Sequence, residues 1–374
     1  MKKKILIIVL MLIIYSTSCN IQNQCYASSG RILIVDDDAE IDPDNLTWNT
    51  ISDALDHAKR MDTINVYNGT YFENLNIDKD VDIIGQSCDL YGDDLDGIII
   101  DGGLNSDVIS ITSYGVFIKG ISVENSGDQC AGFNIQSYST TIEKCGSKNN
   151  HFGILCDETY SIILSKNNLT NNNEAGIYLR SSYNDLTIYD NTISYNGAGI
   201  LCDQITNAFI SNNHIHNNQG AAIYMTHNSI NNEIHRNKIE NNSIGIELWW
   251  SSNNNIISEN IITNSSETGI YTDFETSIQT SNLLIEKNKL FNNSEGIYLY
   301  HVKGAEIIDN NISGSLNGIY CEISNYSDFN KNALLNNNIG IYQNDCIGNK
   351  LTNNKLTIRL LSIFDLKKER AATR

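Results

Sequence analysis

Carboxylates and aromatic side chains recur in this chain at fixed offsets from a repeated glycine–aliphatic pair. In residues 295–301, Gly296 is followed by Ile, Tyr, Leu and Tyr. Glu247 lies two residues after its glycine, and Asp273 and Glu322 lie four residues after theirs. Carboxylate pairs held roughly 5–10 Å apart can cleave glycosidic bonds. Flat aromatic rings beside carboxylates suit sugars, which offer apolar ring faces and rims of hydroxyls. Sugar cleavage and sugar binding are therefore the first chemistries to consider.

These residues belong to an internal repeat with a period of 21 to 27 residues. A glycine or alanine followed by an aromatic or aliphatic residue marks ten units, at Gly132, Gly153, Gly176, Gly199, Ala222, Gly245, Gly269, Gly296, Gly318 and Gly340. A second phrase, Asn-x-aliphatic, is offset from the first and occurs at Asn167, Asn191, Asn213, Asn237, Asn260, Asn288, Asn310, Asn332 and Asn354. Two phrases that keep the same period over this length are typical of a solenoid.

Each unit contains three short runs in which apolar residues alternate, which is the periodicity of β-strands. One unit cannot bury its apolar face alone, but stacked units can if each strand pairs in parallel with its equivalent one coil on. The sequence therefore predicts an all-β protein, a parallel β-helix with coils of about 22–24 residues and right-handed by the crossover rule. We expect the asparagines to tolerate left-handed angles at a bend and to stack as an amide ladder, and the glycines to serve a bend before the next strand.

The predicted domain organisation has four parts. Residues 1–27 have a basic start and an apolar run typical of a secretory signal peptide, so we expect a secreted, periplasmic or cell-surface protein. Residues 28–62 form an N-terminal cap region, in which apolar residues at 51, 54, 55 and 58 predict an amphipathic helix. The β-helix spans residues 63–357, and residues 358–374 form a C-terminal tail or cap.

Net charge and cysteine content limit the partners. The formal charge is −19, and removing a signal that carries three lysines leaves −22, because −19 − 3 = −22. Nucleic acids and anionic membranes need a basic surface, so neither is an expected partner, and no segment of the mature chain is expected to span a membrane. Three of the cysteines, Cys156, Cys202 and Cys321, occupy an inward position of the repeat and are predicted to be core residues rather than disulfide partners.

One outward face of the repeat carries the aromatic residues, which we predict to bind carbohydrate: Tyr178, Tyr224, Trp249, Tyr271, Tyr298, Tyr300, Tyr320 and Tyr342. A structural alternative stays open, because aromatic neighbours on a sheet stabilise one another by roughly 0.2–1 kcal/mol per pair. Catalysis by Glu247, Asp273 and Glu322 on the same face is a further alternative.

The segment TISDALDHAKRMDTINVYNGTYFENLNIDKDVDIIG (residues 50–85) and the GIYL and NKIENN units that follow resemble secreted parallel β-helix proteins. That group includes NosD-type periplasmic copper-binding proteins, surface-layer-associated proteins, and sugar hydrolases and lyases. The resemblance implies the fold over residues 32–357, but the group shares a scaffold rather than a reaction. The short motifs typical of polygalacturonases, pectin esterases and alginate epimerases are missing, which weighs against an enzyme.

The NosD resemblance raises the question of a metal. His214 and His216 lie on the same outward face of one strand, and Glu240 is expected one coil on, beside His216, so the three could hold copper or zinc. Acidic runs at residues 36–38 and 93–96 could attract calcium, although no ligand spacing matches a known loop. No other cofactor is expected. The function expected from the sequence is non-catalytic binding of a polysaccharide or cell-surface glycan. The alternatives are a lyase or hydrolase that uses acids of the same face, and NosD-like copper handling.

Overall fold

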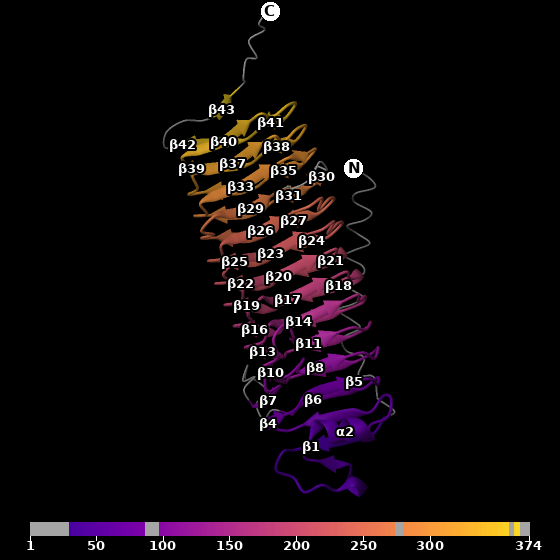
Figure 1. Cartoon of the computed structure of the whole chain (residues 1–374). Helices are drawn as coiled ribbons and strands as arrows, with labels where there is room; N and C mark the ends of the chain where they lie inside the picture. Colours follow the sequence, from indigo (N-terminus) through magenta and orange to yellow (C-terminus); the bar gives the residue numbers. More distant parts are fainter. Residues whose placement is uncertain (1–29, 87–96, 274–279, 359–362, 367–374) are drawn as a thin grey trace, which may run out of the picture.

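The computed structural model describes residues 30–86, 97–273, 280–358 and 363–366, which form a long rod of stacked coils (Figure 1). Three parallel sheets run along the rod, with 15, 13 and 13 strands, and each strand pairs with its equivalents in the coils on either side. The predicted parallel β-solenoid is confirmed.

Sheet A contains, in spatial order, β2 (Thr47–Trp48), β1 (Ile32–Val35), β3 (Thr63–Val66), β6 (Asp82–Gly85), β9 (Phe117–Lys119), β12 (Thr141–Glu143), β15 (Ile163–Ser165), β18 (Tyr183–Tyr189), β21 (Thr206–Ser211), β24 (Glu233–His235), β27 (Ile256–Ser258), β31 (Leu284–Glu286), β35 (Glu306–Ile308), β38 (Asp328–Asn330) and β41 (Lys350–Thr352).

Sheet B contains β4 (Gly69–Phe72), β7 (Ile98–Asp101), β10 (Ser122–Glu124), β13 (Gly146–Lys148), β16 (Asn168–Thr170), β19 (Thr192–Ser194), β22 (His214–His216), β25 (Lys238–Glu240), β28 (Ile261–Thr263), β32 (Lys289–Phe291), β36 (Asn311–Ser313), β39 (Ala333–Asn337) and β42 (Lys355–Ile358).

Sheet C contains β5 (Leu75–Ile77), β8 (Ile109–Ile111), β11 (Ala131–Ile135), β14 (Phe152–Asp157), β17 (Ala175–Arg180), β20 (Ala198–Asp203), β23 (Ala221–Thr226), β26 (Ile244–Leu248), β29 (Thr268–Thr272), β33 (Glu295–Tyr300), β37 (Asn317–Glu322), β40 (Ile339–Asn344) and β43 (Ile363–Leu366). Two short strands, β30 (Thr280–Ser281) and β34 (Val302–Lys303), pair separately.

The core consists of aliphatic columns that the alternation within each strand turns inward. In sheet C, Ile200, Ile223 and Ile246 are register partners in successive coils, and each is 0% exposed. Fully burying one such side chain contributes roughly 1.5–3 kcal/mol, so the repeated columns hold the coils together. Cys156, Cys202 and Cys321 lie in this core at 0% exposure, as predicted.

Buried asparagines stabilise the bend between sheets A and B. The amide of Asn213 donates to the side-chain oxygen of Asn237 at 3.0 Å and to the carbonyl of Ile188 at 3.0 Å, and the same pattern recurs along the rod. This is the predicted ladder. The left-handed conformation, however, belongs to the residue before each ladder asparagine, such as Arg236 and Glu259, and not to the asparagine itself. The expectation that the ladder residues take left-handed angles was therefore wrong.

The recurrent glycines also have a different role from the one expected. Gly296 lies inside β33, and its φ is not positive, so it does not make a bend. A Cβ at this position would lie 2.3 Å from the carbonyl oxygen of Gly318 and 2.5 Å from Cγ2 of Ile312. Glycine is favoured at this position because a Cβ would force the backbone of the next coil or a side chain of sheet B to shift.

The predicted helix is α2 (Ile51–His57), which contacts β1, β2, β3 and β5 at the indigo end of the rod (Figure 1). The Thr50 side chain caps its N-terminus by accepting a hydrogen bond from the Asp53 backbone N–H. Ile51, Ala54 and Leu55 are buried against the first coils. The 3₁₀ helix η1 (Pro43–Asn45) precedes α2.

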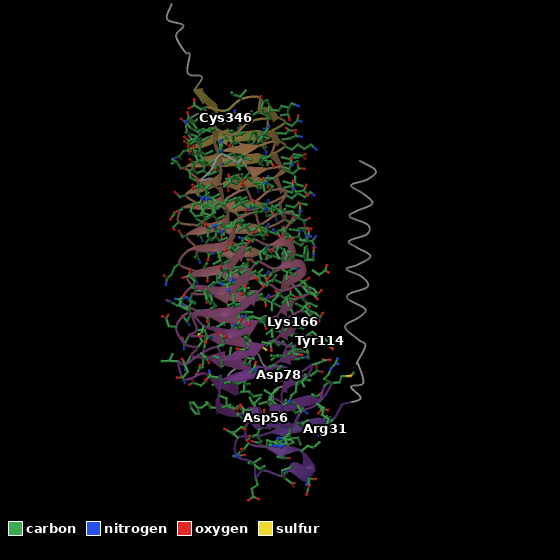
Figure 2. All side chains as sticks on the ribbon, turned by 45° about the vertical axis from the view of Figure 1, so that its right-hand side comes forward. Arg31, Asp56, Asp78, Tyr114, Lys166 and Cys346 are labelled. Atoms are coloured by element: carbon green, nitrogen blue, oxygen red, sulfur yellow. The ribbon has the colours of Figure 1, made fainter. Side chains whose placement is uncertain are left out.

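The sheets extend past the predicted domain boundaries at both ends. β1 lies in the region expected to be a cap, and β43 lies in the expected tail, where it pairs with β40. Arg31 and Cys346 lie toward opposite ends of the rod (Figure 2). The predicted signal peptide, residues 1–27, lies outside the described residues. Among the residues that are described, no helix has the length and apolarity needed to cross a membrane.

Candidate functional site

The predicted aromatic residues form a column on the outer face of sheet C. Tyr271, Tyr298, Tyr320 and Tyr342 are register partners in β29, β33, β37 and β40, and each is partly exposed. The ring centroids of Tyr298 and Tyr320 lie 4.5 Å apart with the planes nearly parallel at 10°. The parallel register therefore turns one position of the repeat into a continuous aromatic surface.

Carboxylates accept hydrogen bonds from the hydroxyls of this column. Tyr298 donates to Glu322 at 2.6 Å, and Tyr320 donates to the same oxygen at 3.3 Å. Tyr271 donates to Asp273 at 2.8 Å. Burial followed by the Glu322 contact raises the pKa of Tyr298. These bonds fix the ring orientations, and they leave Glu322 as a structural partner of the tyrosines rather than a free acid.

Glu247 interrupts the tyrosine column. It lies in β26 with Tyr224 as its register partner on one side and Tyr271 on the other. Burial, followed by the charges of Asp273 and Glu267, raises the pKa of Glu247 to about 7. Among the described residues, no donor makes a hydrogen bond to its carboxylate. We call this position, with Tyr224 and Tyr271, the Glu247 break.

Trp249 lies beside the Glu247 break. Its ring centroid is 6.1 Å from that of Tyr224 and 5.7 Å from that of Trp250. Trp250, a residue that the sequence reasoning missed, has a φ of 48° and packs edge-on against His227 at 4.1 Å. Trp249 and Trp250 thus add the two largest aromatic side chains to one stretch of the face. The adjacent Trp-Trp pair was the signal that could have pointed to Trp250.

In β14, β17 and β20, the outer face of sheet C carries an ion pair and apolar side chains in addition to tyrosine. Arg180 binds Asp157 with two hydrogen bonds of 2.8 and 2.6 Å, and Tyr178 donates to Asp203 at 3.4 Å. Leu155 and Phe152 pack together on the outside of the sheet, with Tyr178 against them. Tyr300, the last of the predicted aromatic residues, is half-buried and its ring lies 6.3 Å from that of His301.

A second set of tyrosines, not expected from the sequence, lines the turn that leads into sheet A. Tyr114, Tyr138 and Tyr160 stack with centroids 5.5 and 4.7 Å apart and planes only 6° apart, and the Arg60 guanidinium lies 5.2 Å from the Tyr114 ring. Tyr114 marks this side of the rod in Figure 2. The rings cover one another's faces, so this stack offers edges rather than open faces.

One hollow in the described residues lies away from the aromatic face. It is a shallow polar trough of about 540 Å³ at the bend between sheets B and C, lined by asparagine, serine, glycine and leucine residues from 264 to 338. The trough contains no aromatic or ionisable side chain. The chemically distinctive surface is the extended face of sheet C.

Together, the fold and the face define an elongated parallel β-solenoid with an aromatic, acidic surface along one sheet. The family model described as "Periplasmic copper-binding protein (NosD)" matches residues 49–280 and 238–359, so the chain belongs to the NosD family. A comparison with curated proteins found no match.

Solved structures share the fold at low sequence identity. The mannuronan C-5 epimerase AlgE6 A-module of Azotobacter vinelandii is 13% identical, with a TM-score of 0.54 over 84% of this chain and 93% of its own. The periplasmic alginate epimerase AlgG is 15% identical, with a TM-score of 0.52 over 79% of this chain and 77% of its own. The Dettilon tailspike protein gp208 is 14% identical, with a TM-score of 0.59 over 89% of this chain and 68% of its own. At these identities the likeness establishes the fold.

The described residues do not fit the copper that the family description implies. His216 and Glu240 are register partners as expected, but the Glu240 carboxylate lies 2.9 Å from His214 and 2.6 Å from the Lys238 ammonium. The Lys238 ammonium forms an ion pair with the Glu240 carboxylate and would compete with a metal ion for it. The two imidazoles and Glu240 do not form a close three-ligand group, and we derive no chemistry through copper.

Acidic residues at the N-terminal end form the one close group of three potential ligands within the described residues. Oxygen atoms of Asp36, Asp37 and Asp38 lie within 4.8 Å of one another. Carboxylate oxygens are hard ligands that suit calcium rather than copper. Asp37 accepts a hydrogen bond from the Thr70 backbone N–H at 3.2 Å, so this cluster also helps to hold the first coils. The second predicted acidic run, residues 93–96, lies outside the described residues.

Proposed function

We propose that this protein is an exported protein that binds an extended polysaccharide along the outer face of sheet C without cleaving it. The column from Tyr271 to Tyr342, continued by Trp249 and Tyr224 across the Glu247 break, is the observation that carries the proposal. Strands stack at ~4.8 Å, so equivalent side chains repeat along the rod at a distance comparable to one sugar ring in an extended chain.

The character of the surface supports a polymer rather than a small molecule. Solenoids present long, regular surfaces of this kind to elongated ligands. The aromatic residues offer apolar contact, and the hydroxyls and carboxylates beside them offer the hydrogen-bonding groups that sugar hydroxyls need. The structural neighbours include proteins whose names refer to alginate and mannuronan, which adds a reason to test polysaccharides first.

Catalysis on the same face is the second candidate, and one observation favours it. Glu247 has a pKa raised to about 7, and the Asp273 charge contributes to that shift, so a proton donor and a carboxylate base lie near each other. Glu322, the third predicted acid, is already held by two tyrosine hydroxyls. Binding without cleavage remains our proposal. Aromatic side chains that can contact a sugar repeat along the face, whereas Glu247 and Asp273 are its one pair of acids suited to catalysis.

A panel of immobilised polysaccharides tests the proposal if bound protein and released products are measured together. The protein from residue 28 onward is compared with Trp249→Ala and Tyr298→Ala. Tyr195→Ala is the matched control, since Tyr195 is 56% exposed and follows sheet B, away from the face. We expect binding without product, weakened at least tenfold in the two face variants and unchanged in the control.

Two results would overturn this proposal. Release of reducing ends or unsaturated sugars would establish the catalytic alternative, with Glu247→Gln as the variant that should abolish it. Failure to bind any polysaccharide, or equal binding by all variants, would leave the tyrosine column as a device that stabilises the sheet.

A further inference from the structure

The acids on the face of sheet C outnumber its bases. Six carboxylates project from this face, and Arg180 is the one guanidinium or ammonium among the described outward positions of β11 to β40. Five of the carboxylates have donors: Arg180 for Asp157, Tyr178 for Asp203, Tyr271 for Asp273, Asn317 for Glu295, and Tyr298, Tyr320 and Asn344 for Glu322. Glu247 is the sixth.

Glu247 differs from the other five in lacking a donor within the described residues. Burial, followed by the nearby charges of Asp273 and Glu267, raises the pKa of the Glu247 carboxyl. The Ser243 hydroxyl donates to Glu267 at 2.8 Å, which satisfies Glu267 but not Glu247. A half-buried carboxylate beside another acid is stabilised when a positive charge arrives, because the new charge offsets both the burial and the repulsion.

We propose that the Glu247 break recognises a positively charged polysaccharide, one that carries free primary amines on hexosamine units. The proposal rests on the glycan-binding function above and names the class of glycan. An ammonium group at this position would meet the unpaired carboxylate of Glu247 and the negative charge of Asp273. Tyr224 and Tyr271 are the register partners of Glu247 in the neighbouring coils, and the Trp249 ring lies 6.1 Å from that of Tyr224.

The aromatic surroundings favour an organic ammonium over a metal ion. Aromatic rings attract ammonium groups through their negative faces, and the same rings pack against the apolar face of the sugar that carries the amine. Calcium takes six to eight oxygen ligands, whereas Glu247 and Asp273 do not belong to any close three-ligand group of the described chain.

The charge of the face also separates glycan classes. A polyuronate would bring a carboxylate to every residue and would be repelled by six acids that share one guanidinium. A neutral glycan would meet no repulsion but would leave Glu247 without a partner. A polyamine glycan is the class that this surface favours.

Calorimetric titration with three hexamers tests the inference: glucosamine, N-acetylglucosamine and galacturonic acid. We expect the glucosamine hexamer to bind at least tenfold more tightly than the N-acetylated hexamer, with a preference that weakens in high salt. Glu247→Gln should remove most of that preference. The control is Glu306→Gln, which removes one charge from an exposed position on sheet A.

Each other outcome overturns the inference in a distinguishable way. If the N-acetylated or galacturonate hexamer binds as tightly as glucosamine, the face still binds glycans and the proposed class is wrong. If Glu247→Gln retains the preference, the amine is recognised elsewhere. If calcium binds at Glu247 and displaces the hexamer, the Glu247 break is a metal site. If no hexamer and no polysaccharide of the panel binds, the proposed function itself falls. Thermal unfolding of both variants verifies that they remain folded.

Discussion

Replacing one asparagine of the ladder by alanine should destabilise the rod far more than an exposed asparagine does. Asn237 is 1% exposed, and its side chain takes part in four hydrogen bonds. Its amide donates to Ile210 O at 2.9 Å and to Asn260 Oδ1 at 3.0 Å. Its oxygen accepts from the backbone and side-chain nitrogens of Asn213, each at 3.0 Å.

The magnitude follows from what Asn237→Ala leaves behind. The backbone N–H of Asn213 loses its partner inside the core, at a cost of about 1–3 kcal/mol, and each of the other bonds contributes about 0.5–1.5 kcal/mol net. We expect a loss of about 2.5–7.5 kcal/mol in the free energy of unfolding. The residue does not have a positive φ, so alanine adds no backbone strain.

Urea denaturation combined with hydrogen exchange measures this loss, because coils of a solenoid can open separately. Exchange should accelerate first in the coils around residues 213, 237 and 260. Asn173→Ala is the control: Asn173 is exposed, and its backbone bond to Asn150 O does not depend on the side chain. The control should stay within about 0.5 kcal/mol of the native protein. A loss below about 1 kcal/mol in Asn237→Ala would refute the reasoning about the ladder.

Three further predictions concern protonation, packing and thiol reactivity. The folded state raises the pKa of Glu247 from 4.5 to about 7, so it binds this proton more tightly than the unfolded chain does, and stability falls as pH rises through that window. Glu247→Gln should therefore gain about 1–2 kcal/mol at pH 8, after allowance for partial exposure, and nothing below about pH 4.5. Gly296→Ala should lose about 1–3 kcal/mol or more in urea denaturation, because its Cβ has no room beside the next coil. Contact with the Cys321 thiol lowers the pKa of Cys346 to about 7, so native-state alkylation followed by mass spectrometry should modify Cys346 before the fully buried Cys321.

Each of these predictions has a control or a contradicting result. If Glu247→Gln and the native protein show the same dependence of stability on pH, the Glu247 carboxyl of the native protein is solvated. Gly220→Ala, where the nearest atom to an added Cβ is 3.1 Å away, should cost less than Gly296→Ala, and equal losses would contradict the packing argument. Equal alkylation rates at the two thiols would contradict the difference in burial and pKa.

The period of the repeat made the main fold predictable. Once glycine–aliphatic and Asn-x-aliphatic phrases are aligned, parallel stacking follows, and with it the inward position of Cys202 and the outward position of Tyr298. The register needs no knowledge of distant contacts, because each coil pairs with a copy of itself. The amphipathic pattern of residues 51–58 likewise identified α2.

Other features depend on contacts that a repeat pattern does not encode. A second asparagine ladder, which includes Asn172, Asn196 and Asn218, lies at the next bend, and the frequent Asn-Asn pairs concealed which residue faces inward. The role of Gly296 depends on how near the next coil's carbonyl comes, and the αL position depends on the angle of the bend. The binding of tyrosine hydroxyls by Glu322 depends on side-chain reach across coils. The unpaired state of Glu247 could be found only after its neighbours were located.

Tryptophan fluorescence tests the central claim most directly, because the chain has three tryptophans and Trp48 is only 2% exposed, in a different sheet. The protein is titrated with a polysaccharide that it binds, beside a variant that carries both Trp249→Phe and Trp250→Phe and is shown to be folded. If the glycan lies on sheet C, emission should change along the same saturation curve as calorimetric binding, and the double variant should lose most of that change. Saturable binding with unchanged emission would contradict the account and place the glycan on another surface.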